Sequence, residues 1–309
     1  MKVVILGKGS MLANLIEGLR VAGIDIAAVY RHERTTCSWL HLKLKDFFKS
    51  SPEYTLIKNY KLKEITCRSA NSEKFKREIL KLNADIILVG TWKEKLKKEI
   101  IDLPKIATVN VHPSLLPKYR GPNPYIQTIL NGEKSSGITF HLMSENFDEG
   151  AILAQKEIEI LPSYTSKELK EKTVFQARIL VAEVLNKVCH GMIEPLAQDE
   201  SQASYYTNIT GDEKMLDFIN MSSTQIINTV RALHPYLPAY ITCKCGFLIV
   251  NPYKIRLINK IGRPGEIIQK SYRKSSLAIC CADGRVLEMG GLKLYKFPML
   301  TRLFIKYLI

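Results

Sequence analysis

Three polar residues in the middle of the chain have the types and spacing expected of a catalytic site. Asn110 and His112 lie two residues apart in the strand-like run IATVNVHP, and Asp148 follows a second such run, SSGITFHLM. Alternate residues of a strand project to the same face, so the amide and the imidazole share one side of a sheet. Asp148 joins them if the second strand lies alongside. The sequence therefore predicts an amide, an imidazole and a carboxylate together at strand ends, where open α/β sheets bind ligands.

These side chains suit the direct transfer of an acyl group to an external nucleophile. An Asn amide and a protonated imidazole can donate hydrogen bonds to an oxyanion as it forms, an effect worth roughly 3–4 kcal/mol per donor. The carboxylate would favour the charged imidazole, or accept the proton that an attacking amine loses. No Ser or Cys stands in a recognisable nucleophile turn, which argues against an acyl-enzyme. The alternative is a structural role for each residue, and the other five histidines have no evident companions.

The surrounding elements predict a doubly wound, Rossmann-like α/β domain with a mostly parallel sheet. Residues 3–7 form an apolar first strand, and a glycine turn, an amphipathic helix and a second strand follow. The run ADIILVGTW is continuously apolar, as expected of a strand that helices cover on both faces. Leu12 replaces the third glycine of a dinucleotide-binding turn, so the pattern gives only weak support for a nucleotide there.

The pattern further along the chain predicts a second domain. We expect the first domain over residues 1–190, a polar linker over 191–214, and a small β-barrel-like (OB-like) domain over 215–309, where short strand-like runs alternate with turns. The tail FPMLTRLFIKYLI is apolar with spaced basic residues. It would be either a docked terminal element or a membrane-surface helix.

The composition is that of a soluble globular protein with a strong basic excess. No apolar run reaches membrane-spanning length, and the seven cysteines suit free thiols in a reducing compartment, so we expect a cytoplasmic protein. The cysteine spacing does not match a zinc site, and no metal is expected. The net charge of +15 suits a polyanion such as tRNA or a phosphorylated substrate. Simple solvation of the lysines is the alternative.

The central segment resembles the 10-formyltetrahydrofolate-dependent formyltransferases. The run NVHPSLLPKYRG and the later FDEGAI match that family's Asn-x-His, SLLPxxRG and Asp-x-Gly pattern. This resemblance covers residues 1 to about 190. The runs VRALHPYLPA, RPGEII and ADGRVLEM are similar to the C-terminal domain of the methionyl-tRNA formyltransferases within that family.

The resemblance implies a mechanism and a set of site residues. Asn110, His112 and Asp148 would be the catalytic set, and tetrahydrofolate would leave after an acceptor amine attacks the N10-formyl carbon. The formyl donor is then a co-substrate. Folate-binding residues implied in the same way are Leu88, Gly90, Trp92, Ser114, Leu115, Leu116 and Pro117.

The formyl acceptor is left open. Methionyl-tRNA formyltransferases carry a PDRPAGRGKK-like loop that enters the tRNA acceptor stem, whereas the corresponding RHERTTCSWLHLKLKDFF is basic but does not match. The candidates are initiator methionyl-tRNA and an amino sugar nucleotide, and no acceptor-binding residue can be assigned. Two other activities compete with transfer: hydrolysis of 10-formyltetrahydrofolate, and folate or RNA binding without catalysis.

Overall fold

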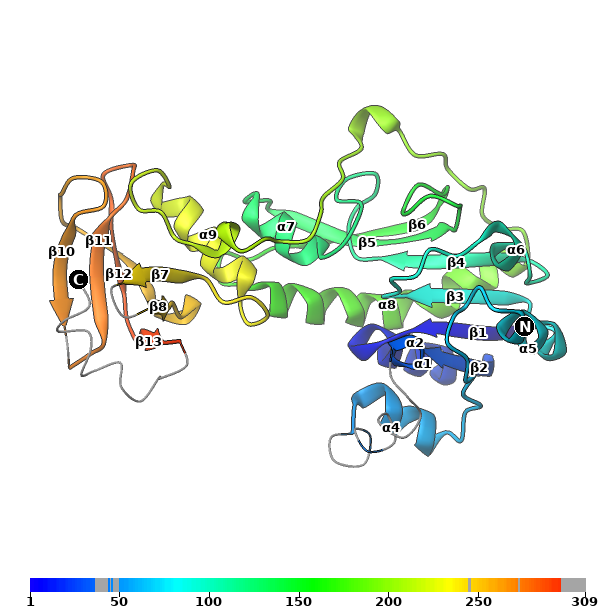
Figure 1. The fold of residues 1–309 in the computed structure, drawn as a ribbon. Coiled ribbons are helices and arrows are strands. Elements are labelled where there is room, and N and C mark those ends of the chain that lie inside the picture. The colour runs from blue at the N-terminus through cyan, green and yellow to red at the C-terminus, as the bar shows by residue number, and fades with distance from the viewer. Residues whose placement is uncertain (37–43, 45, 47–49, 244–245, 272, 296–309) are drawn as a thin grey trace. The chain divides into compact units, whose positions relative to one another are not determined.

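The computed structural model describes residues 1–36, 44, 46, 50–243, 246–271 and 273–295 (Figure 1). The apolar-basic tail lies outside the described residues, as does much of the region that lacks the tRNA-loop pattern. The chain forms two compact units that interleave in sequence. The first comprises Met1–Gly121, Ser136–Ile158 and Lys170–Tyr206, and the second comprises Pro122–Ser135, Glu159–Leu169 and Thr207–Ile309. The domain limits expected at residues 190 and 214 stay a prediction.

A six-stranded sheet organises the first unit, with the strand order β2-β1-β3-β4-β5-β6. The strands are β1 (Lys2–Gly7), β2 (Asp25–Arg31), β3 (Ile86–Gly90), β4 (Ala107–His112), β5 (Ser135–Leu142) and β6 (Ile152–Glu159). β1 pairs in parallel with β2 and β3, and β3 with β4, whereas β5 runs antiparallel to β4. The predicted Rossmann-like, mostly parallel sheet is confirmed.

Helices bury both faces of this sheet. The helices that contribute to its core are α1 (Gly9–Val21), α4 (Pro52–Asn59), α5 (Glu73–Leu82), α6 (Lys98–Ile101) and α8 (Ser166–Cys189). The short helix α2 (Glu33–Thr36) follows β2. Val3 and Ile5 of β1 belong to one core cluster with α1 and α8, whereas Val4 and Leu6 belong to another with α5 and α6. Successive side chains of a strand point to opposite faces, so a strand covered on both sides is apolar throughout.

The glycine turn after β1 is hydrogen-bonded to the side-chain carboxylate of Glu53. Glu53 of α4 is buried, and its Oε1 accepts a hydrogen bond of 3.0 Å from the backbone N–H of Gly9 at the start of α1. Dinucleotide-binding folds place a phosphate at this helix end. The internal carboxylate and the missing third glycine therefore both disfavour a nucleotide there.

The second unit contains α7 (Pro124–Leu130), α9 (Ser223–Leu233) and an antiparallel β domain. One sheet has the order β10-β11-β12-β9 and the other β13-β8-β7. These strands are β7 (Tyr240–Cys243), β8 (Gly246–Ile249), β9 (Ile255–Ile258), β10 (Ile267–Ser271), β11 (Ser276–Cys280), β12 (Val286–Met289) and β13 (Lys293–Leu294). The small β domain expected from the short strand-like runs is confirmed. Within the described residues, no helix is both long and apolar enough to cross a membrane.

The contact between α1 and α8 yields a stability prediction. A Cβ on Gly18 would lie 2.3 Å from the backbone oxygen of Arg178 and 2.6 Å from Val181 Cγ1. Gly18→Ala should therefore push the helices apart and lower the free energy of unfolding by about 1–3 kcal/mol, even though alanine favours helices.

Urea denaturation measures this change. Gly211→Ala is the matched control, because a Cβ there meets no atom within 4 Å and the backbone has a φ of −62°. Its effect should stay within about 0.5 kcal/mol. Equal unfolding midpoints for Gly18→Ala and the parent protein would contradict the tight contact.

Candidate active site

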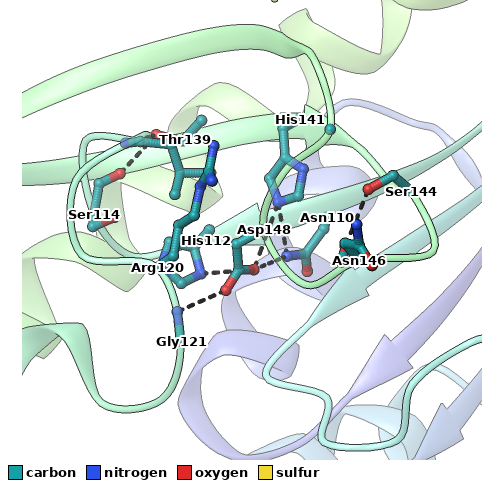
Figure 2. A network of polar contacts seen from close by, with 12 residues as sticks. Asn110, His112, Ser114, Arg120, Gly121, Thr139, His141, Ser144, Asn146 and Asp148 are labelled. Atoms are coloured by element: carbon teal, nitrogen blue, oxygen red, sulfur yellow. Dashed lines mark hydrogen bonds and ion pairs between the residues drawn. The ribbon is translucent and has the colours of Figure 1, made fainter. Parts of the chain in front are cut away.

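The three predicted catalytic residues meet where β4 ends. His112 Nδ1 lies 3.2 Å from Asp148 Oδ1, and Asn110 Nδ2 lies 3.4 Å from the same oxygen (Figure 2). Asn110 and His112 come from alternate positions of β4, as expected, whereas Asp148 comes from the loop between β5 and β6. The predicted amide, imidazole and carboxylate are therefore one cluster.

The loop that carries Asp148 has a constrained backbone. Asp148 adopts a left-handed conformation with a φ of 61°, which is uncommon for a residue with a side chain. A Cβ on Gly150 would lie 1.7 Å from the backbone oxygen of Leu142, so only glycine allows this close approach. Asp148 Oδ2 accepts a hydrogen bond of 2.9 Å from the backbone N–H of Gly121. This geometry aims the carboxylate at His112.

His112 lies between two acceptors. Its Nε2 is 2.9 Å from the carbonyl oxygen of Tyr119, while its Nδ1 faces Asp148. Burial lowers the pKa of His112, but the charge and hydrogen bond of Asp148 and the Tyr119 carbonyl raise it further, so the net pKa is above its ordinary value. Burial raises the pKa of Asp148, yet His112 and the Gly121 N–H outweigh it and bring the pKa to about 2. The pair is therefore a buried imidazolium and a carboxylate.

A second histidine belongs to the cluster, contrary to the expectation that the others have no companions. The antiparallel register places His141 opposite Asn110 and Thr139 opposite His112. His141 Nδ1 lies 2.7 Å from the carbonyl oxygen of Leu142, and its Nε2 lies 3.0 Å from Asn110 Nδ2. With its proton on Nδ1, His141 accepts a hydrogen bond from the Asn110 amide and fixes the orientation of that amide.

His141 also differs from His112 in charge. Burial lowers its pKa to about 4 despite the nearby charge of Asp148. The sequence contained a usable signal, because Thr139 and His141 repeat the two-residue spacing of Asn110 and His112 in the following strand. An antiparallel pairing of the two strands would have predicted that His141 lies opposite Asn110 and Thr139 opposite His112.

The loop predicted to bind folate is tied to β5 and β6. Its residues are Ser114, Leu115, Leu116 and Pro117. Thr139 Oγ1 donates to the carbonyl of Ser114 at 2.6 Å and accepts from the N–H of Leu116 at 3.2 Å. Gln155 Nε2 donates to the carbonyl of Leu116 at 2.7 Å. The loop is therefore held in one conformation, beside His112, by strand residues that sequence analysis did not single out.

The predicted pterin-pocket residues occupy different environments. Leu88 is fully buried in the core cluster with α1 and α8, so its side chain is a packing residue. A Cβ on Gly90 would lie 2.9 Å from Met11 Cγ, so a glycine is needed here because α1 packs closely against the strand. Trp92 is half-buried, its ring lies 5.1 Å from that of Tyr30, and its buried Nε1 has no partner among the described residues. The Trp92 ring packs against the core cluster that contains α5 and α6.

The charged residues of the cluster do not form a metal site. Among the described residues, no group of three or more His, Cys, Asp or Glu side chains could hold a metal ion. The cluster instead combines an amide donor, an imidazolium and a carboxylate. Such a set can stabilise a developing oxyanion and relay a proton.

Comparison with known proteins agrees with this chemistry. Residues 1–185 match the formyl transferase family, and residues 208–304 match the formyl transferase C-terminal domain. Methionyl-tRNA formyltransferase of Enterococcus faecalis (strain ATCC 700802 / V583) is 29% identical over 297 residues, 94% of this chain and 91% of that protein. The enzyme of the same name from Clostridium novyi (strain NT) is 32% identical over 212 residues, 68% of this chain and 67% of that one.

Solved structures show the same fold. The N-formyltransferase of Helicobacter canadensis, in complex with folinic acid and dTDP-3-aminofucose, matches with a TM-score of 0.71 and 20% identity over 94% of this chain and 99% of that one. HypX of Aquifex aeolicus matches with a TM-score of 0.67 and 17% identity, and this chain spans about half of it, 48%. The resemblance found in the sequence is thus confirmed: the chain is an enzyme of the formyl transferase family.

Proposed function

We propose that the protein transfers the formyl group of 10-formyltetrahydrofolate to an amine, with Asn110, His112 and Asp148 as the catalytic set. The observation that carries this proposal is the position of His112, held between Asp148 and the Tyr119 carbonyl beside the Asn110 amide. Folate ligands in related structures support the donor: folinic acid in the Helicobacter canadensis enzyme and tetrahydrofolic acid in HypX.

The amine attacks the formyl carbon, and the carbonyl oxygen takes up negative charge. Of the two contacts that the Asn110 amide makes, the one to Asp148 is the longer, at 3.4 Å, so the hydrogen on that side is the one that an oxyanion could share. Both ring nitrogens of His112 face acceptors in the structure, so its contribution is mainly the positive charge of the imidazolium. The amine loses one proton and N10 of tetrahydrofolate gains one, so the reaction needs no external acid or base.

Ser114, Leu115, Leu116 and Pro117 would hold the folate next to these groups. We assign the pterin side to the strand end that runs from Leu88 through Gly90 to Trp92. Since Leu88 is buried in a central strand, it would support this strand end by packing in the core. The support for this pocket is the family match, because the unpartnered Nε1 of Trp92 is itself buried and a heterocycle could reach it only if the ring moved.

Initiator methionyl-tRNA is the acceptor that we propose first. The support is the near full-length similarity to methionyl-tRNA formyltransferase of Enterococcus faecalis and the net charge of +15. An amino sugar nucleotide is the second candidate, because the Helicobacter canadensis structure contains one and the sequence lacks the tRNA-loop pattern. The cluster could also activate water, which would make the protein a 10-formyltetrahydrofolate hydrolase. The cytoplasmic location stays a prediction.

An acceptor screen separates these alternatives. Purified protein is incubated with 10-formyltetrahydrofolate and either charged initiator tRNA, dTDP-linked amino sugars, or buffer alone. We expect formyl-methionyl-tRNA to accumulate, with a rate that falls as salt increases, because a polyanion must be bound. Transfer to the amino sugar alone would refute the tRNA proposal, and formate release without any acceptor would identify a hydrolase.

Substitutions within the cluster test the assigned roles. His112→Ala and Asp148→Asn should each lower kcat about 100- to 1,000-fold, the loss typical of removing an oxyanion stabiliser. Single-turnover formyl transfer measures the chemical step, and circular dichroism checks the fold. Glu149→Gln is the matched control, because this neighbouring carboxylate is exposed and should leave kcat unchanged. Near-normal turnover in either cluster variant would remove that residue from the mechanism.

The pKa values of the two buried histidines, His112 and His141, should be shifted in opposite directions from the ordinary value of a histidine. We expect His112 to carry its charge to a higher pH than an ordinary histidine, because both ring nitrogens face acceptors and its pKa is raised, and His141 to stay neutral down to a pH of about 4. Burial lowers the pKa of His112, and the negative charge of Asp148 outweighs this effect. Asp148→Asn removes that charge, so the pKa of His112 should fall below its ordinary value. Nitrogen NMR of labelled histidine measures both, with Glu149→Gln as the control. An unchanged His112 titration in Asp148→Asn would contradict the ion pair.

A further inference from the structure

The side chain of Gln198, in the segment after α8, bridges two loops of the site. Its Nε2 donates to the carbonyl oxygens of Asp148 at 2.7 Å and Gly150 at 2.8 Å. Its Oε1 accepts from Arg120 Nη2 at 2.8 Å and from Arg120 Nε at 3.2 Å. Both hydrogens and both lone pairs of the amide are used, so Gln198 is satisfied in one orientation only.

Arg120 makes this bridge rigid. It is 4% exposed, and its guanidinium forms a bidentate pair with Glu200, Nη1 to Oε2 at 2.8 Å and Nη2 to Oε1 at 2.6 Å. Such fork-to-fork pairs are among the more directional contacts in proteins. Backbone hydrogen bonds also hold Arg120 in place. Its N–H donates to the carbonyl oxygen of Ser204 at 2.8 Å, and its own carbonyl oxygen accepts from the N–H of Tyr206 at 3.0 Å.

The same segment also supports the second acceptor of His112. Ser204 Oγ accepts from the Tyr119 N–H at 2.9 Å, and the ring of Tyr206 stacks on that of Tyr119 at 5.1 Å. Tyr119 and Asp148, the two residues that hold His112, are thus both fastened to residues 196–206. Neither of these contacts is local in sequence.

The carbonyls of Asp148 and Gly150 belong to the turn that aims the catalytic carboxylate. The backbone of Asp148 has a left-handed conformation there, and a residue with a side chain keeps such a conformation only when surrounding contacts hold it. Gln198 supplies that constraint, since it fixes the two carbonyls against Arg120, whose neighbour Gly121 donates to Asp148 Oδ2. Without the amide, both carbonyls lose this donor and the guanidinium keeps only Glu200, so the turn is free to change.

We infer that Gln198 is a positioning residue of the formyl transfer site, which holds the Asp148 carboxylate on His112 by fixing the backbone around Asp148. The inference rests on the proposed function for the roles of His112 and Asp148. The contacts of Gln198 themselves do not depend on it. Gln198 would act in the chemical step without touching either substrate.

The test compares Gln198→Met, which keeps the length of the side chain and removes the amide, with Gln202→Met. Gln202 is exposed in the same segment and is the matched control. The readouts are the NMR titration of His112 and kcat and KM for 10-formyltetrahydrofolate. A displaced Asp148 should lower the pKa of His112 and lower kcat about 10- to 100-fold, with little change in KM, because small misplacements in an active site have effects of this size.

In an Asp148→Asn background, Gln198→Met should cause no further fall in the pKa of His112, because the group that it positions is already neutral. Gln198→Asn, which keeps the amide on a shorter stem, serves if the methionine variant does not fold. A lowered melting temperature with unchanged His112 titration and unchanged kcat would overturn the inference and leave Gln198 as a tether. If the protein transfers no formyl group, the titration still decides, and an unchanged His112 pKa again overturns it.

Discussion

The buried pair of His112 and Asp148 is the interaction on which the rest of the site depends. A charge removed from water is tolerated only with a partner and with its remaining hydrogen-bonding capacity used. The structure meets this demand with the Tyr119 carbonyl on one side of His112 and the Gly121 N–H on Asp148. His141 remains neutral, so the carboxylate is not shared between two imidazolium ions. One positive charge is thereby fixed beside the Asn110 amide.

The fold supplies this pair by ending a parallel sheet with an antiparallel strand. β4 runs parallel to β3 and delivers Asn110 and His112 to its carboxyl end, where ligands bind in such sheets. β5 returns beside β4, and its register places Thr139 and His141 against them. Thr139 then ties down the loop after β4, and the chain beyond β5 returns Asp148 to the same point. The proposed catalytic residues and the supporting Thr139 and His141 thus come from one strand pair and its two loops.

How much of this could be predicted depends on the range of the interaction. The apolar runs of β1 and β3 and the spacing of Asn110 and His112 are local signals, and they correctly indicated a doubly wound sheet with a polar cluster at β4. His141 needed the strand register, which a single sequence does not specify. The contacts of Gln198 could be predicted only from the complete fold, because this residue lies fifty positions from Asp148 and seventy-eight from Arg120 in the sequence. Leu88 shows the converse: a residue near a strand end can still point into the core.

The charges around the cluster also bear on the acceptor. Arg120 is the basic residue of the SLLPxxRG pattern, yet its guanidinium is occupied by Glu200 and Gln198 and is almost wholly buried. It therefore serves the architecture of the site and is not available to an acceptor phosphate. As the proposed catalytic set, Asn110, His112 and Asp148 would need only an amine and a formyl group, so the same cluster would suit a nucleic acid and a sugar nucleotide alike. Selectivity between the two candidate acceptors would then arise from residues outside the cluster.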